Sequence, residues 1–214
     1  MRTYEKIETI WARDVEGTKK LIPGKYRSET VEFLKDCMWE WTEKIDGTNI
    51  RVCWDGHSVT FGGRTDRAQI PAPLVNRLNA LFGGEENAQL FEQMFGEKEV
   101  VLFGEGYGAK IQNGGGYIPD GVDFALFDVL IGENYQTREW VDLTAKAFHV
   151  NTVPVVGFGT LEEAVDFVIG HPKSNIGTCD MEGLVCRPTV ELRDRRGERV
   201  IVKIKWKDLK DVEA

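Results

Sequence analysis

A lysine followed closely by an aspartate and a glycine stands in the run EKIDGTN, residues 43–49. The unprotonated amine of Lys44 is a nucleophile that can form a covalent intermediate. Asp46 can help to hold a metal ion, or it can fix the turn before Gly47 by hydrogen bonding to the backbone. A solvated surface lysine produces the same short pattern, so Lys44 must be weighed with the rest of the chain.

Two further lysines near the other end of the chain alternate with apolar residues in the run VIVKIKW, residues 200–206. A β-strand points successive side chains to opposite faces, so Lys203 and Lys205 share one face while Val202 and Ile204 share the other. One strand therefore presents two cations to the same ligand. The competing interpretation is an amphipathic strand with solvated lysines.

Two glycine-rich stretches, residues 104–108 and 114–116, invite comparison with phosphate-binding loops. The first has Gly-x-Gly-x-Gly spacing, which differs from the dinucleotide fingerprint, and no Gly-Lys-Ser/Thr follows either stretch. We expect these glycines to let the backbone turn sharply beside a ligand, with a plain flexible loop as the alternative.

The elements that must position these residues form a mixed pattern of strands and helices. We predict a hairpin with strands at 50–54 and 57–61 around the turn Asp55-Gly56, because alternating apolar residues flank that pair. Helices are expected at 73–82, 86–95, 137–148 and 160–169, the last opened by a capping box. Strands are expected at 99–103, 122–131, 182–187, 190–193 and 199–206.

Composition sets the broad class. The 214 residues are 42% hydrophobic and 29% charged, which fits a single globular domain spanning 1–214. No apolar run reaches the roughly 18 residues that cross a membrane, and no signal peptide begins the sequence, so a cytoplasmic location is expected.

The net charge of −8 argues against a protein that coats nucleic acid through its overall field. Residues 187–210 nevertheless hold nine basic and four acidic side chains.

Taken in order, the motifs resemble those of the covalent nucleotidyltransferase superfamily, and within it the phage-type ATP-dependent RNA ligases. The resemblance runs from about Trp39 to Lys207. It rests on short motifs in the family's order: KIDG at 44–47 with Asn49, GR at 63–64, FGEG at 103–106, FALFD at 124–128, EGLV at 182–185 and VKIK at 202–205. The resemblance implies an α+β fold, a ligase adenylation domain of mostly antiparallel sheets with flanking helices.

The resemblance also implies roles for individual residues. Lys44 would be the catalytic nucleophile, and ATP would be the substrate, with Mg²⁺ or Mn²⁺ as cofactor. Glu182 would hold the metal, with Asp46 as a helper. The residues expected to bind the nucleotide are Glu43, Asn49, Arg64, Glu105, Phe127, Lys203 and Lys205, with Phe124 as a second candidate for stacking on adenine. Ordinary lysines are almost entirely protonated at neutral pH, and the neighbouring cations would favour the neutral amine that attacks phosphorus.

The expected function is ATP-dependent RNA ligation, in which AMP passes from Lys44 to a 5′-phosphate before a 3′-hydroxyl seals the strand. RNA ends, including those of a nicked duplex, would be the partners. The motifs end close to Lys210, so we expect no separate C-terminal domain, and a partner protein or the basic segment 187–210 could replace one. A small DNA ligase, a capping guanylyltransferase and a non-catalytic nucleotide- or RNA-binding module are the alternatives. Residues 104–117 favour RNA by resemblance.

Overall fold

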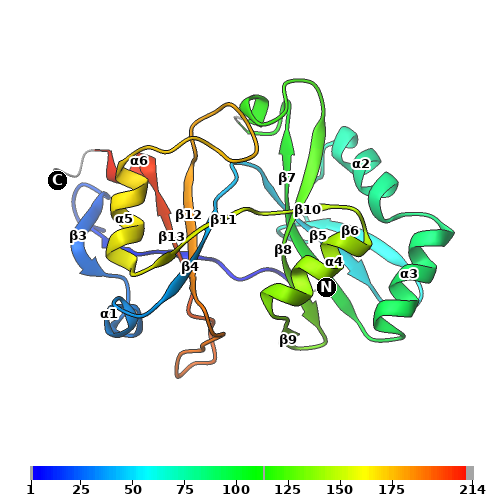
Figure 1. The fold of residues 1–214 in the computed structure, drawn as a ribbon, viewed down its shortest axis with the longest axis horizontal. Helices are drawn as coiled ribbons and strands as arrows, with labels where there is room; N and C mark the ends of the chain where they lie inside the picture. Colours follow the sequence, from blue (N-terminus) through cyan, green and yellow to red (C-terminus); the bar gives the residue numbers. More distant parts are fainter. Residues whose placement is uncertain (1, 113, 211–214) are drawn as a thin grey trace. The chain divides into compact units, whose positions relative to one another are not determined.

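A computed structural model describes residues 2–112 and 114–210, which form two compact units (Figure 1). The first unit comprises residues 2–5 and 46–153, and the second comprises residues 6–45 and 154–210. Each unit is therefore assembled from two stretches of chain. The boundary at 45/46 falls inside the EKIDGTN run, so the unit that carries Lys44 differs from the one that carries Asp46.

The first unit is built on a mostly antiparallel sheet with strand order β10-β8-β7-β5-β6, with β9 paired to β8. Its strands are β5 (Thr48–Trp54), β6 (Val59–Gly63), β7 (Val100–Gly108), β8 (Val122–Ile131), β9 (Asn134–Tyr135) and β10 (Asn151–Thr152). Its helices are α2 (Ala72–Phe82), α3 (Glu85–Phe95) and α4 (Arg138–Ala147), with a 3₁₀ turn at Gly114–Gly116. All three helices contribute buried apolar residues to one core against this sheet.

The second unit is built on a five-stranded sheet with order β1-β13-β12-β4-β11, in which only the β1–β13 pairing is parallel. Its strands are β1 (Glu8–Thr9), β4 (Trp39–Glu43), β11 (Val155–Gly159), β12 (Gly183–Pro188) and β13 (Val202–Lys205), beside a ribbon of β2 (Trp11–Arg13) and β3 (Leu21–Tyr26). The helices are α1 (Glu29–Leu34), α5 (Leu161–Ile169) and α6 (Trp206–Leu209). Apolar residues of β4, β12, β13 and α5 form its core.

Most predicted elements are confirmed, because their hydrophobic periodicity is strong. The predicted helices correspond to α2, α3, α4 and α5, and Thr160 and Glu163 form the expected capping box at the start of α5. The mixed α+β class and the mainly antiparallel pairing are also confirmed. No helix within the described residues is long and apolar enough to cross a bilayer.

Several local predictions were wrong. Residues 104–108 do not turn sharply but continue strand β7, because their backbone pairs with β5 and β8. The hairpin joins β5 to β6 through four residues rather than two, since Trp54 pairs with Val59. No strand forms at 190–193, where only a single bridge links Arg193 to Arg199. The last strand covers Val202–Lys205 instead of 199–206, and helix α6 begins at Trp206.

Candidate functional site

A lysine pair shares one carboxylate in the second unit. Lys44 follows the last residue of β4, and its Nζ donates to Glu182 Oε2 at 2.6 Å. Lys205, the last residue of β13, donates to Glu182 Oε1 at 2.5 Å. The exposed fractions of the side chains are 22% for Lys44, 17% for Lys205 and 12% for Glu182, so the cluster is largely screened from solvent. Residues 138 positions apart in sequence are thus joined by direct contact.

Backbone geometry brings these residues together. The Lys44 amide donates to Gly183 O at 2.9 Å, and the Trp206 amide donates to Glu182 O at 3.0 Å. Gly183 has φ +152°, and a Cβ added there would lie 2.0 Å from Ile204 O. Only glycine allows this close approach of β12 and β13. The glycine after Glu182 in the EGLV motif therefore holds the carboxylate at the end of the lysine strand.

Alternation along the sheet separates the lysines from the core. Val202 and Ile204 are both 1% exposed and belong to the apolar cluster, as predicted from their spacing with the lysines. Lys203 and Lys205 consequently lie on the opposite face of β13. Burial, followed by the charges of Lys205 and Lys44, lowers the pKa of Lys203 below its ordinary value.

The electrostatics of Glu182 are dominated by its two lysine partners. Burial opposes its ionisation, but the charge of Lys44 and the hydrogen bond from Lys205 outweigh that effect and hold the Glu182 pKa below its usual range. The carboxylate is therefore charged at neutral pH. Lys203 lies close enough to Lys205 and Lys44 to feel their charge, so three lysines outnumber the one carboxylate of Glu182 and the cluster can attract a polyanion such as a triphosphate.

Glu43 occupies a different position from the lysines. It shares its face of β4 with Trp39 and Trp41, by strand alternation, and is 1% exposed. Its Oε1 accepts a hydrogen bond from Ser174 Oγ at 2.5 Å, and its Oε2 accepts one from the Asn175 amide at 2.8 Å. These contacts tie the segment that leads into Glu182 to strand β4. Neither Ser174 nor Asn175 carried a sequence signal for this role.

In the first unit, adjacent strands align polar residues on the sheet face opposite the apolar core. Asn49 of β5 pairs directly with Glu105 of β7. Ile50, the neighbour of Asn49, pairs with Gly63, so Arg64 follows in register just beyond the end of β6 and is exposed. The Asn49 Oδ1 atom is buried without a hydrogen-bond partner among the described residues. Such an atom is costly unless a ligand donates to it.

A β-bulge in β8 controls the two candidate aromatic residues. Phe103 of β7 pairs with Asp128 and the next residue pairs with Leu126, which leaves Phe127 as the extra residue. Phe127 is half-buried, and its ring lies 5.0 Å from that of Tyr4 at an interplanar angle of 71°. Phe124 is 0% exposed within the apolar core, so it cannot stack on a base. Burial leaves Phe127 as the candidate.

Tyr4 is a contact residue that the sequence did not reveal. Its hydroxyl donates to Asp128 Oδ2 at 2.5 Å, and its ring lies 4.9 Å from Phe103. Asp128 is 1% exposed. Tyr4 therefore contacts Phe127 and the adjacent pair of Phe103 and Asp128, although it lies more than 120 residues away in the chain.

Asp46 and Gly47 are fixed by the first unit's own elements. The Asp46 amide donates to Tyr117 Oη at 3.0 Å. A Cβ at Gly47 would lie 2.3 Å from Gly106 O, so this position has no room for a side chain. The segment around Tyr117 is itself tied back by backbone hydrogen bonds that include the Ala109 amide to Gly121 O at 2.7 Å.

The residues present fit a nucleotide better than a preformed metal centre. In residues 2–112 and 114–210, no three His, Cys, Asp or Glu side chains gather as a metal site. Magnesium commonly binds through one or two carboxylates together with substrate phosphates, which suits an isolated Glu182. Both Glu182 oxygens are occupied by lysine, so a cation bound there would displace at least one of those contacts.

The two mainly antiparallel sheets with their flanking helices form a nucleotidyltransferase-type ligase fold. The family model described as RNA ligase matches residues 38–205, and the chain belongs to that family. A comparison with curated proteins finds no match.

Solved structures of an RNA ligase from Naegleria gruberi share the fold. An apo mutant has a TM-score of 0.67 at 18% identity, covering 98% of this chain and 57% of that one. A mutant with ATP and Mn has a TM-score of 0.66 at 20% identity, covering 95% and 56% respectively. A structure with PPi has a TM-score of 0.63 at 20% identity, covering 98% and 64%. This chain thus spans less than two thirds of the length of those proteins.

Proposed function

We propose that the chain is the adenylating portion of an ATP-dependent RNA ligase, in which Lys44 accepts AMP from ATP. The observation that carries the proposal is the Lys44–Glu182–Lys205 cluster at the end of the β13 strand, in a chain whose residues 38–205 match the RNA ligase family. The presence of ATP and Mn in a similar ligase structure supports the choice of nucleotide and metal.

The first step begins with release of the nucleophile. An ammonium group has no free electron pair, so Lys44 must leave Glu182 Oε2 and lose a proton before it attacks. Its Nζ then bonds to the α-phosphorus of ATP while the bond to the bridging oxygen breaks and pyrophosphate leaves. Lys203 and Lys205 stabilise the negative charge on the phosphates and the leaving group.

The first unit supplies groups suited to the nucleoside. In this proposal Phe127 stacks on adenine, and Asn49 and Glu105 accept hydrogen bonds from hydroxyl or amino groups. Arg64 contacts phosphate or ribose. A divalent cation held by Glu182, with Asp46 as helper, supplies further positive charge to the phosphates when bound. Glu43 acts as a positioning residue, because its carboxylate oxygens already accept hydrogen bonds from Ser174 and Asn175.

The two later steps transfer AMP to the RNA end and then break the resulting phosphoanhydride to form the phosphodiester. An oxygen of an RNA 5′-phosphate attacks the α-phosphorus and releases Lys44, giving a 5′-adenylylated end. A 3′-hydroxyl then attacks the 5′-phosphorus, and AMP leaves as the phosphodiester forms. RNA ends are therefore the proposed partners.

Adenylation is tested by incubation with α-labelled ATP and divalent cation followed by denaturing electrophoresis. Wild-type protein and Lys207→Ala, an exposed lysine two residues beyond Lys205, should retain label, whereas Lys44→Ala should retain none. Labelled GTP run in parallel should give no adduct. Absence of label on folded wild-type protein, shown by mass spectrometry to be free of AMP beforehand, would refute the mechanism.

The acceptor is tested separately with 5′-phosphorylated RNA, DNA and mixed nicked substrates. Sealing of RNA ends supports the proposal. Sealing of an all-DNA nick with no action on RNA would identify a small DNA ligase instead.

A further inference from the structure

The N-terminal segment is basic in a chain that is acidic as a whole. Residues 6–27 carry six Lys or Arg and three Asp or Glu, against a net charge of −8 for the 214 residues. This segment precedes the family match, which begins at residue 38. Its charge is therefore not explained by the adenylation motifs.

Strand β1 connects this segment directly to the lysine strand. Thr9 pairs with Lys203, and Glu8 pairs with Val202, on the edge of the five-stranded sheet. The Glu8 carboxylate accepts from Lys6 at 3.0 Å and from Arg27 at 3.4 Å. Burial opposes ionisation of Glu8, but Lys6, Arg27 and Lys203 together lower its pKa. This partly exposed carboxylate thus gathers Lys6 and Arg27 at the β1 edge, within electrostatic range of Lys203.

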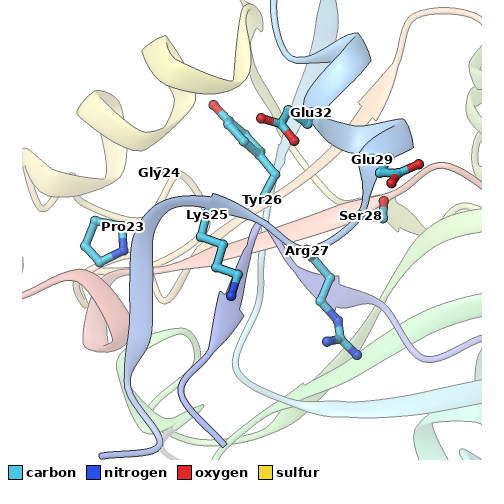
Figure 2. Close-up of a pocket in the computed structure, with 8 residues that line it drawn as sticks. All are labelled: Pro23, Gly24, Lys25, Tyr26, Arg27, Ser28, Glu29 and Glu32. Atoms are coloured by element: carbon cyan, nitrogen blue, oxygen red, sulfur yellow. The ribbon is translucent and has the colours of Figure 1, made fainter.

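The end of β3 extends the same row of cations. Figure 2 shows Lys25 and Arg27 extending to one side of the strand while Tyr26 extends to the other. Tyr26 packs against the apolar core, which holds the two cations outward. In extended backbone, residues two apart are separated by roughly 6.4–6.8 Å along the chain, so two cations at this spacing can contact neighbouring phosphates. An open pocket here is lined by Pro23, Gly24, Lys25, Tyr26, Arg27, Ser28, Glu29 and Glu32.

The arginines of the basic segment predicted from sequence, residues 187–210, pair with separate carboxylates, whereas Lys6 and Arg27 share the single carboxylate of Glu8 and so keep an excess of positive charge. Arg187 pairs with Glu40 at 3.0 Å, and Arg199 pairs with Glu191 at 2.8 Å. Arg196 pairs with both Asp194 and Glu198. Much of that positive charge is neutralised locally, because the acidic residues of the segment fold back onto its arginines.

We propose that Lys6, Lys25 and Arg27 form a binding track for the phosphate backbone of the RNA substrate, continuous with Lys203 along the β1 edge. The inference rests on the proposed ligase function and assigns the RNA to a specific surface of the second unit. Such a track reads no sequence, because phosphate contacts position a strand without distinguishing its bases.

The test compares two double variants with the same change in charge. Lys25→Ala with Arg27→Ala removes two cations of the track. Arg195→Ala with Arg196→Ala removes two exposed cations from the loop that follows β12. Binding of a fluorescent, 5′-phosphorylated single-stranded RNA is measured by anisotropy across a salt series, and adenylation by α-labelled ATP is measured on the same preparations.

For the track variant, two lost phosphate contacts should lower the slope of log affinity against log salt by roughly 1.4, at about 0.7 per contact for a single strand. If wild type and variant bind RNA equally at 1 M salt, that difference in slope makes the RNA affinity of the variant about tenfold weaker near 0.15 M salt. The control variant should bind within about threefold of wild type, and both should accept AMP at the wild-type rate.

Wild-type RNA affinity and slope in the track variant would overturn the proposal, as would an equal loss in the control variant, which would show that only net charge matters. The outcome is separable from that of the proposed function. A protein that fails to take label from ATP refutes adenylation, whereas the comparison of the two double variants still judges the track.

Discussion

Replacing Glu182 with glutamine should destabilise the second unit, because it leaves Lys44 and Lys205 without the carboxylate that they share. Removing one partner of a buried ion pair typically costs roughly 3–5 kcal/mol. Glu182, Lys205 and Lys44 retain 12%, 17% and 22% exposure, so we expect the lower end, about 3 kcal/mol. With a denaturant slope of about 2 kcal/mol per molar urea, the midpoint should fall by about 1.5 M.

The stability difference between wild type and Glu182→Gln should also depend on pH, which gives an independent test of the same interaction. The Glu182 pKa is depressed in the folded protein, so its stabilising effect is complete above the ordinary carboxyl pKa and is lost as pH falls through the folded value. The difference between wild type and Glu182→Gln should therefore be full at pH 7 and should shrink below about pH 4. High salt should reduce it only partly, because the cluster is screened from solvent.

Urea unfolding followed by tryptophan fluorescence at pH 7, 5 and 3 measures both effects. Glu198→Gln is the matched control, since Glu198 is 65% exposed and pairs with Arg196 at 3.0 Å on the surface. Such pairs contribute about 0–1 kcal/mol. A Glu182→Gln protein as stable as wild type at pH 7, or a difference that persists unchanged at pH 3, would refute the electrostatic reasoning.

Three other substitutions test separate parts of the structure. Gly47→Ala should cost about 1–3 kcal/mol and impair adenylation, since its Cβ would meet Gly106 O at 2.3 Å, whereas Gly115→Ala, with open space around it, should fold normally. Lys203→Met should raise stability at pH 7 by up to about 1 kcal/mol while slowing adenylation, because burial and like charge lower the Lys203 pKa. That advantage should shrink as pH rises toward 10, where an ordinary lysine loses its charge, and a constant difference would contradict it. Tyr4→Phe should cost about 1–3 kcal/mol in thermal or urea unfolding, because the buried Asp128 loses a hydrogen bond, and an unchanged midpoint would contradict that role.

Elements with strong periodicity were predictable, and elements that depend on partners were not. The run at 122–131 reads as a buried strand from composition alone. The bulge at Phe127 within it depends on the register with β7, which no local pattern specifies. The glycines at 104–108 suggested turns because glycine permits them, yet neighbouring strands hold that backbone extended on both sides.

The candidate site residues could be identified from the sequence, but their individual roles depended on tertiary contacts. Residue type and order identified the lysines, the acidic residue before β12 and the aromatic motif. Contacts then distinguished among them: burial excluded Phe124, and the Ser174 and Asn175 bonds gave Glu43 a positioning role in the proposal.

By itself, the sequence determined the fold class, the family and the chemical character of the site. Hydrophobic periodicity and the order of short motifs can be read along the chain without knowing any tertiary contact. Tertiary structure decided which charges face each other. Lys44 and Lys205 meet on Glu182 only because Gly183 lets two strands approach closely. Arg187 and Arg199 each have a carboxylate partner, whereas Lys6 and Arg27 share Glu8, because ion pairing depends on distances of a few ångströms that the sequence alone does not specify.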